Sequence, residues 1–369
     1  MKIKDICNSV TDGSHNPPRG IEYSEYMMLS SKNIYDDEIT FDEPRYLTDE
    51  DFKREHKRTN ISEGDVLLTI VGTVGRTAIV DKNMPIFTLQ RSVAVLHPKQ
   101  ELCLGRFLMY ALRGKRTYIE NHAKGVAQKG IYLGEVSDID LKLPDIVEQE
   151  QIIKILDNVC EIIKLRKLEL RSLDNLIKAR FVELTEEIET ASTRMGDIAT
   201  YLNGYAFKPT QWEETGLPII RIQNLNDKNA PYNYFSGSLA DRYFVQNGDV
   251  LVSWATHLEA YIWKGQDAWL NQHIFKVVFD KMEVDKIYFV YACEEALRQA
   301  FRNAHGFKPT MEHIKKADFD NAIVKLPKIE VQEQFADFVN QVDKSKVAVQ
   351  KALDETQKLF DSLMQQYFG

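Results

Sequence analysis

Several features are missing from this 369-residue sequence, and each absence excludes a class of protein. No run of 18 or more apolar residues is present, so we expect no membrane-spanning helix. The N-terminal segment lacks the apolar core of a signal peptide. The four cysteines (Cys7, Cys103, Cys160 and Cys293) show no Cys-x-x-Cys spacing. The scattered cysteines argue against a zinc site or a disulfide framework, and they favour a reducing cytoplasm.

Catalytic motifs are also absent. Asn16-Pro17-Pro18 resembles the loop with which amino-methyltransferases hold adenine, but Arg19 replaces the stacking aromatic and no glycine-rich strand-turn-helix for a methyl donor is present. Val71–Arg76 lacks the Lys-Ser/Thr ending of a nucleotide-binding loop. The eight histidines form no metal-binding i, i+4 pair with a nearby carboxylate. We therefore interpret both motifs as turns and expect no metal and no catalytic residues.

The net charge of −8 argues against a free-standing nucleic-acid-binding protein, which usually carries a basic surface. Two conditions would answer this objection: basic residues gathered on one face, or partner subunits that supply phosphate contacts. The length favours two or three domains.

A stretch from Glu148 to Glu187 contains neither glycine nor proline. Its apolar residues recur in steps of four and three, with Arg166 and Arg180 at the two positions of this stepping that are not apolar. Such a repeat predicts a long helix with a partner helix. At about 1.5 Å per residue, such a helix is about 57 Å long. The stripe consists of Ile152, Leu156, Val159, Ile163, Leu170, Leu173, Ile177 and Leu184.

The C-terminal stretch from Glu333 to Tyr367 has the same stepping, offset by 183 residues. Its stripe consists of Phe335, Val339, Val342, Val349, Leu353, Phe360, Leu363 and Tyr367. The lead-ins also match, since Leu143-Pro144 corresponds to Leu326-Pro327. Two long helices in one register, each after about 140 residues, indicate an internal duplication.

The segments before the helices follow one plan. Glu63–Val80 predicts a hairpin whose Gly-Asp start recurs at Gly248-Asp249, and Asp36–Arg58 is expected to be a charged, turn-rich surface segment. Asn271-Gln272-His273 is matched with Leu89-Gln90-Arg91, which pairs Gln90 with Gln272. For these two glutamines, a buried amide that satisfies backbone groups is favoured over a ligand contact.

Polar residues near the helix starts are candidates for DNA contact. Lys124, Gln128 and Lys129 share a glycine-containing segment, and the equivalent place in the second half holds His305, Lys308 and Thr310. Long polar side chains there could contact base edges or phosphates. The same residues also suit a solvated loop, and the sequence leaves both interpretations open. Arg76 is a further candidate, because an arginine at a turn tip can contact guanine or phosphate.

Taken in order, these motifs resemble the specificity (S) subunit of Type I DNA restriction–modification systems. The resemblance rests on separate motifs spread along the chain, Val10–His15, Glu63–Arg76, Ala127–Gln149 and Met195–Ile222, and their order is more specific than any one of them. It departs at Trp254–His257, which lacks the glycines present at 72 and 75, and at Lys328, which replaces Asp145. With Glu148, Asp145 suits an N-terminal cap on the first long helix only.

The resemblance implies an α+β fold with pseudo-two-fold symmetry: two tandem, similar α/β target recognition domains separated by two long antiparallel helices that form a coiled coil. We predict the first domain over residues 1–147, the first helix over 148–190, the second domain over 191–330 and the second helix over 331–369. Each domain would read one half of a split site in double-stranded DNA, and the helices would set the spacer.

The resemblance also implies no catalysis by this chain. Its partners would be two methyltransferase (M) subunits, which use S-adenosylmethionine, and restriction/translocase (R) subunits, which need ATP and Mg. Three alternatives stay open: the specificity subunit of a related system whose partner fuses nuclease and methylase, a coiled-coil scaffold that binds no DNA, and an enzyme with an unrecognised cofactor site.

Overall fold

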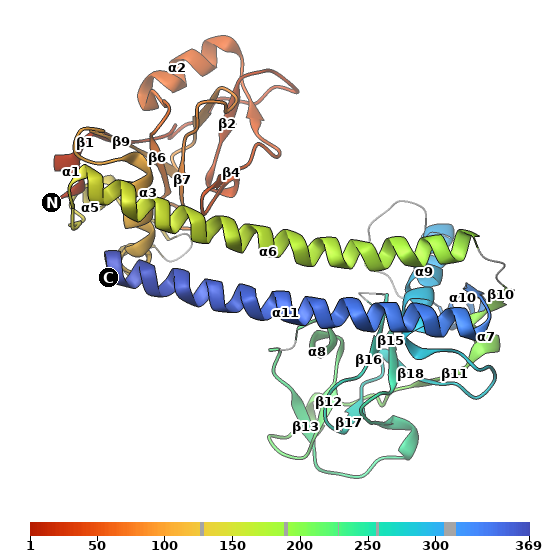
Figure 1. The fold of residues 1–369 in the computed structure, drawn as a ribbon. Coiled ribbons are helices and arrows are strands. Elements are labelled where there is room, and N and C mark those ends of the chain that lie inside the picture. Colours follow the sequence, from red (N-terminus) through yellow and green to blue (C-terminus); the bar gives the residue numbers. More distant parts are fainter. Residues whose placement is uncertain (126–128, 188–190, 228, 256–257, 306–314) are drawn as a thin grey trace. The chain divides into compact units, whose positions relative to one another are not determined.

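The structure of the chain is a computed structural model, which describes all residues except 126–128, 188–190, 228, 256–257 and 306–314. The chain forms two compact units. Unit 1 comprises Met1–Lys167 with Lys351–Gly369, and unit 2 comprises Leu168–Gln350. Each unit therefore holds one mixed domain and a part of both long helices (Figure 1).

The elements of the first domain alternate short strands with short helices. In chain order they are α1 (Ile3–Ile6), β1 (Cys7–Asp12), β2 (Met27–Leu29), η1 (Ser31–Asn33), β3 (Ile34–Tyr35), β4 (Glu38–Ile39), β5 (Arg45–Tyr46), α2 (Asp49–Thr59), β6 (Val66–Thr69), β7 (Thr77–Ile79), β8 (Phe87–Leu89), β9 (Val93–Pro98), α3 (Gly105–Gly114), α4 (Arg116–His122) and α5 (Leu133–Ser137). The first long helix, α6, follows at Ile146–Glu187.

The second domain has a similar series. Its elements are β10 (Ala191–Arg194), α7 (Met195–Ile198), β11 (Thr200–Asn203), η2 (Pro209–Gln211), β12 (Leu217–Ile220), α8 (Ile222–Asn226), β13 (Asn233–Phe235), η3 (Asp241–Tyr243), β14 (Phe244–Val245), β15 (Val250–Ser253), β16 (Glu259–Ile262), β17 (Ala268–Leu270), β18 (Ile274–Val278), α9 (Lys286–His305), α10 (Lys316–Asn321) and β19 (Ile323–Leu326). The second long helix, α11, spans Ile329–Phe368.

The sheets confirm the duplication. An antiparallel sheet of order β1-β9-β6-β7 in unit 1 has the same order as β11-β18-β15-β16 in unit 2. A second sheet in each domain contains one parallel pair, β2 with β8 and β12 with β17. The predicted hairpin over 63–80 is confirmed as β6 and β7. The architecture is α+β, as expected.

The segment over residues 36–58 is less irregular than predicted. It contains strands and the helix α2, whose N-cap Thr48 accepts a hydrogen bond from the backbone of Asp51. Phe52 is buried in this helix and stacks against Tyr26. The segment lies largely on the surface, as expected, but it is not turn-rich throughout, because Phe52 docks a short helix among the charges.

The long helices pair within each unit. In unit 2 they run antiparallel, because Asp174 of α6 contacts Lys346 of α11 at 2.6 Å while Phe181 lies 5.6 Å from Phe335 (Figure 1). These two contacts place later residues of α6 beside earlier residues of α11. In unit 1 the start of α6 belongs with the end of α11, which is the same direction of pairing.

A buried glutamine joins each long helix to its domain. Gln149 accepts from the backbone of Leu104 at the start of α3 (2.9 Å) and donates to Pro144 O (2.9 Å). Gln332, 183 residues later, accepts from the backbone of Asp285 at the start of α9 (3.1 Å) and donates to a proline carbonyl at 2.8 Å. Both side chains are buried, so each fixes the angle at which its helix leaves the domain.

No helix in the described part of the chain is long and apolar enough to cross a membrane.

Candidate nucleic-acid interface

Both domains start their central hairpin with a Gly-Asp turn. Gly64 (φ +84°) and Gly248 (φ +88°) adopt the left-handed backbone that favours glycine. The next residue, Asp65 or Asp249, accepts a hydrogen bond from the backbone N–H three residues before it, at 2.7 and 2.8 Å. The turn therefore fixes where β6 and β15 begin, and with them the loops at the far ends of these strands.

A second glycine in each domain allows two backbone segments to touch. A Cβ atom on Gly13 would lie 2.1 Å from the carbonyl oxygen of Leu89, and one on Gly204 would lie 2.2 Å from that of Asn271. Real side chains do not tolerate such contacts. Only glycine lets the segment after β1 or β11 cross the chain at the end of β8 or β17.

In unit 1 this crossing fixes a turn between β8 and β9. The backbone N–H of Gln90 donates to Leu29 O at 2.9 Å, and that of Arg91 donates to Ser14 O at 2.9 Å. The N–H of Val93 closes the turn on the carbonyl of Gln90 at 3.1 Å. Three backbone hydrogen bonds therefore hold the turn at both sides.

The turn between β17 and β18 of unit 2 is held in the same way. Asn271 N–H donates to Ile220 O at 3.1 Å, and Gln272 N–H donates to Tyr205 O at 3.0 Å. Ile274 N–H closes the turn on the carbonyl of Asn271 at 3.2 Å. We call these two segments, Gln90–Ser92 and Asn271–His273, the crossing turns.

This geometry corrects the match made from sequence. Gln272 corresponds to Arg91, and Asn271 corresponds to Gln90, one residue away from the predicted pairing. The parallel pairing of β8 with β2 and of β17 with β12 sets the register at Leu89 and Leu270. The expected buried-amide role was wrong too: both glutamines are only half-buried, and among the described residues neither amide bonds to a backbone group.

In unit 1, backbone hydrogen bonds connect the crossing turn to the segment that carries two predicted contact residues, Lys124 and Lys129. Val71 N–H donates to Ser92 O at 3.3 Å, and Gly72 N–H donates to Lys129 O at 3.0 Å. The residue after Lys129 exchanges two backbone bonds with Lys124, at 2.8 and 2.9 Å. Lys124, Lys129 and the crossing turn therefore lie along one continuous hydrogen-bonded band.

The cations on this band are accessible. Arg91 and Lys129 are exposed, and neither makes an ion pair with any residue that the structure describes. Lys124 is exposed and contacts Glu135 at 2.8 Å, and this hydrogen bond raises the pKa of its ammonium group. An exposed ion pair contributes little to stability, so Lys124 can exchange Glu135 for a phosphate at small cost.

Arg76 is oriented differently from the expectation. Its guanidinium group lies over the ring of Tyr35 at 4.9 Å, and Nη1 donates to the carbonyl of Ile34 at 3.4 Å. The side chain is half-buried against β3 and does not extend from the tip of the hairpin. Its contact with DNA stays a prediction.

The structure describes little of the other predicted contact residues. Gln128, Lys308 and Thr310 lie outside the described residues, and His305 is described only as the last residue of α9. Their roles stay predictions.

The predicted helix stripe coincides with the less exposed face of both long helices. Twelve of its residues are buried: Ile152, Leu156, Val159, Ile163, Ile177, Leu184, Phe335, Val339, Val342, Val349, Leu353 and Phe360. The other four, Leu170, Leu173, Leu363 and Tyr367, are half-buried. The seven-residue stepping missed four buried apolar residues near helix ends, Phe181, Ala336, Met364 and Phe368. Phe181 and Phe368 also pack against rings of their own domains.

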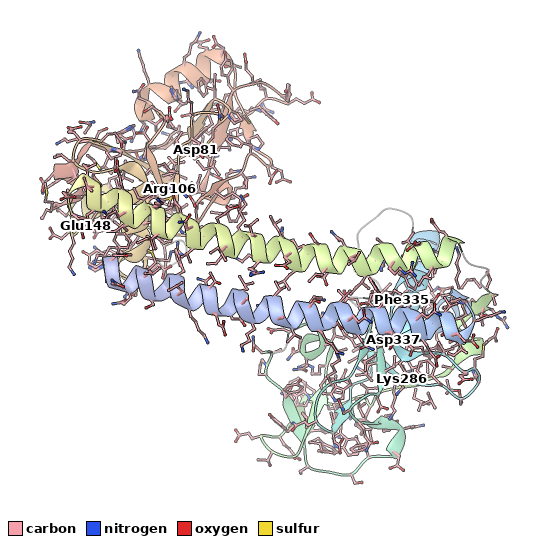
Figure 2. The ribbon with its side chains drawn as sticks, in the orientation of Figure 1. Asp81, Arg106, Glu148, Lys286, Phe335 and Asp337 are labelled. Carbon is pink, nitrogen blue, oxygen red and sulfur yellow. The ribbon has the colours of Figure 1, made fainter. Side chains whose placement is uncertain are left out.

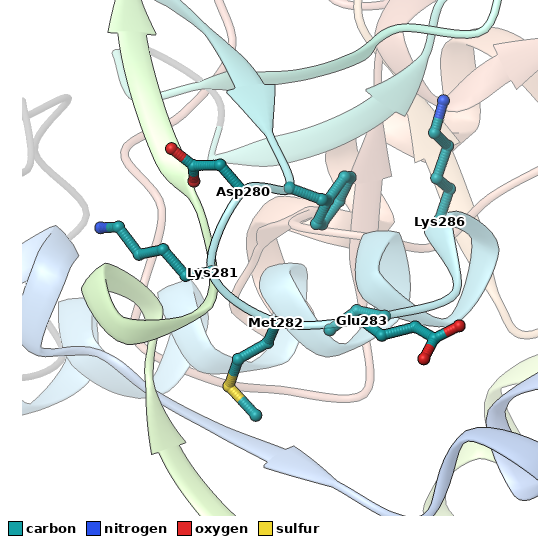
Figure 3. A pocket seen from close by; sticks show the side chains of 7 residues that line it. Asp280, Lys281, Met282, Glu283 and Lys286 are labelled. Carbon is teal, nitrogen blue, oxygen red and sulfur yellow. The ribbon is translucent and has the colours of Figure 1, made fainter.

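A hollow of about 500 Å³ lies elsewhere, in the loop between β18 and α9 of unit 2 (Figure 3). Lys281 in its wall donates to the carbonyls of Gly196 and Ala199, and Lys286 donates to that of Gly248. Backbone groups already occupy both ammonium groups, so this hollow is a poor ligand site. Within the described ranges, no cluster of His, Cys, Asp and Glu could hold a metal ion.

The profile of the family described as "Type I restriction modification DNA specificity domain" matches residues 1–174 and again 187–357. The chain belongs to this family. The two matches coincide with the two copies of the repeated fold, and each contains one crossing turn.

One relative is similar to part of the chain. The chain is 27% identical over 163 residues to the specificity subunit of the Type I restriction enzyme EcoBI from Escherichia coli, a match covering 42% of this chain and 34% of that relative. The chain thus matches about a third of that relative's length.

Two solved structures share the fold over the whole chain. One is the S subunit of a Type I restriction–modification system from M. genitalium, with a TM-score of 0.55, 14% identity and 95% of its length covered. The other comes from work on complex assembly and conformational transition of the type I R-M system, with a TM-score of 0.60, 16% identity and 96% covered.

The sequence analysis did not single out Arg91, which lies exposed on the crossing turn of unit 1. The available signal was the pair Gly13-Ser14 and Gly204-Tyr205, which fixes the crossing and so the correct match. The match by residue type favoured two glutamines instead.

Proposed function

We propose that this chain is the DNA-recognition subunit of a Type I restriction–modification complex, in which each domain reads one half of a bipartite, asymmetric site. One observation carries the proposal: two domains of the specificity family share one backbone plan but differ in the polar side chains at the crossing turns. Two similar readers with unlike contact residues suit two unlike half-sites.

The chemistry would come from partner subunits. We infer that the chain itself binds no cofactor and catalyses no reaction. Two methyltransferase subunits would use S-adenosylmethionine, and restriction/translocase subunits would use ATP and Mg. The complex would act on DNA in the cytoplasm. Phosphate contacts by these partners would also offset the net charge of −8.

The long helices offer a surface for the methyltransferase subunits. On the part of α6 that belongs to unit 1, Ile155, Ile162 and Leu165 are between 40% and 53% exposed. Apolar side chains in this number on one helix favour a protein partner. The same helices would set the number of unspecified base pairs between the half-sites, so inserting two helical turns in each should lengthen the spacer and leave both half-sites unchanged.

The experiment is a map of methylated adenines in DNA from cells that express this chain with its methyltransferase. A split, asymmetric motif that disappears when the chain is deleted would support the proposal. A continuous palindrome, or methylation that is independent of the chain, would contradict it.

The same experiment addresses the alternatives. A coiled-coil scaffold without DNA binding predicts no methylation that depends on the chain. A system with a fused nuclease-methylase predicts a split motif but needs only that single partner for both activities. A cofactor titration of the isolated chain tests the interpretation as an enzyme.

A further inference from the structure

The crossing turns combine a rigid backbone with variable side chains. In each turn, three backbone hydrogen bonds of 2.9–3.2 Å fix the residues, and a glycine packs against the end of the preceding strand. A side chain on such a scaffold starts from a defined position, which direct contact with a base edge requires.

The side chains on the two turns differ at each position. Unit 1 presents Gln90 and Arg91, whereas unit 2 presents Asn271 and Gln272. Arg91 is exposed and the other three are half-buried. Only the backbone of Arg91 takes part in holding the turn, so its side chain is not needed for the fold.

We propose that Gln90 and Arg91 determine base specificity in one half-site, and that Asn271 and Gln272 determine it in the other. This inference rests on the proposed function and names the residues that carry it out. Arginine forms a bidentate contact with O6 and N7 of guanine, and asparagine or glutamine does so with N6 and N7 of adenine. The turn of unit 1 would therefore accept guanine opposite Arg91, and the turn of unit 2 would favour adenine.

The position of the band supports this assignment. Lys124 and Lys129 lie along the hydrogen-bonded band that continues from the crossing turn of unit 1. Lysines that contact the phosphates position a protein on the duplex, while neighbouring side chains reach the base edges. The two functions thus lie side by side on one edge of the domain.

The test uses the whole chain expressed with its methyltransferase partner in cells without other adenine methylation. Methylation at every site would be read by single-molecule sequencing for the native chain, for Arg91→Ala, and for Asn271→Ala with Gln272→Ala. Arg19→Ala is the matched control, because Arg19 is an exposed arginine of the same domain outside the crossing turn.

Arg91→Ala should relax one base position in one half-site by about tenfold to a hundredfold and leave the other half-site unchanged. The Asn271/Gln272 double variant should relax the opposite half-site, and Arg19→Ala should leave the motif intact. Co-purification with the methyltransferase checks that each variant folds.

Two results would overturn the inference. One is an unchanged motif in both variants. The other is a uniform loss of methylation across all sites without relaxation, which would assign Arg91 to a phosphate. The proposed function fails in a different way, since the native chain would then produce no split motif at all.

Discussion

The junction between domain and long helix is polar in unit 1 and aromatic in unit 2. In unit 1, Arg106 of α3, which is labelled in Figure 2, lies at this junction. It donates to Asp157 of α6 at 2.6 Å and to Asp37 at 2.9 and 3.1 Å. Tyr110 donates to the same Asp157 at 2.6 Å. Burial and then this hydrogen bond raise the pKa of Tyr110 above its usual range, so the phenol stays a donor.

Unit 2 has no such ion pair at the equivalent positions, which hold Ile287 and Asn340. At this junction Phe335 of α11 packs among aromatic rings, 5.8 Å from Tyr288 and 5.3 Å from Tyr291. The buried glutamines are common to both units. The hydrogen bonds from the buried glutamines to the backbone therefore maintain the repeated geometry. The other side chains at the junction differ, with an ion pair in unit 1 and aromatic packing in unit 2.

The largest expected effect comes from Phe335→Ala. This side chain is almost fully buried, so its removal leaves a cavity and should destabilise unit 2 by about 3–5 kcal/mol. Hydrogen exchange of peptides from β15 and β18 measures the loss. Val347→Ala, also on α11 but 70% exposed, is the control and should change little. Equal losses for both variants would show that the aromatic junction contributes nothing specific.

The two buried glutamines should differ in magnitude. Gln149 satisfies three backbone groups, since it also donates to Leu102 O at 2.9 Å, whereas two bonds are found for Gln332. We expect Gln149→Leu to cost about 3 kcal/mol and Gln332→Leu about 2 kcal/mol, because buried groups left unpaired dominate the loss. Denaturant unfolding followed by exchange at α3 and α9 compares the two. The reverse order would contradict this account.

The sequence predicted the large features of the fold but missed local features such as strand register and the junction contacts. The duplication and the long helices could be predicted, because apolar stepping over many residues is a strong signal. The one-residue error at Gln272 arose because strands of three residues carry too little pattern to set a register. The parallel partner strand sets it instead.

The junctions could not be predicted from periodicity. Asp157 and Arg106 are 51 residues apart, and the residue spacing within α3 and α6 does not predict the ion pair. Phe181 follows Arg180, a polar residue at a position where the seven-residue stepping calls for an apolar one. Phe181 is nevertheless buried, because the domain, and not only the partner helix, covers that end of α6. Tertiary contacts of this kind override a helical repeat.

A smaller effect is expected at the polar junction. Asp157→Ala leaves the Tyr110 hydroxyl with only its weak 3.6 Å hydrogen bond to Cys160 Sγ and removes one of two carboxylates from Arg106, which should destabilise unit 1 by about 2 kcal/mol. Both charged groups are partly exposed, and solvent limits the loss. Asn340→Ala at the equivalent exposed position is the control and should be near neutral. A neutral Asp157→Ala would mean that apolar packing alone holds this junction.

The smallest effect concerns the starts of the long helices. Asp145 accepts from Glu148 N–H at 2.9 Å and caps α6, whereas Lys328 at the start of α11 can accept nothing with its side chain and carries the wrong charge for a helix N-terminus. Lys328→Asp should therefore stabilise α11 by about 1 kcal/mol, and Asp145→Ala should destabilise α6 by about the same amount. Exchange protection at the first turn of each helix reports the change. Because Lys328 O already accepts from Val331 N–H at 3.0 Å, a neutral Lys328→Asp would show that the backbone alone satisfies this end, and the two helix starts would then differ in sequence but not in stability.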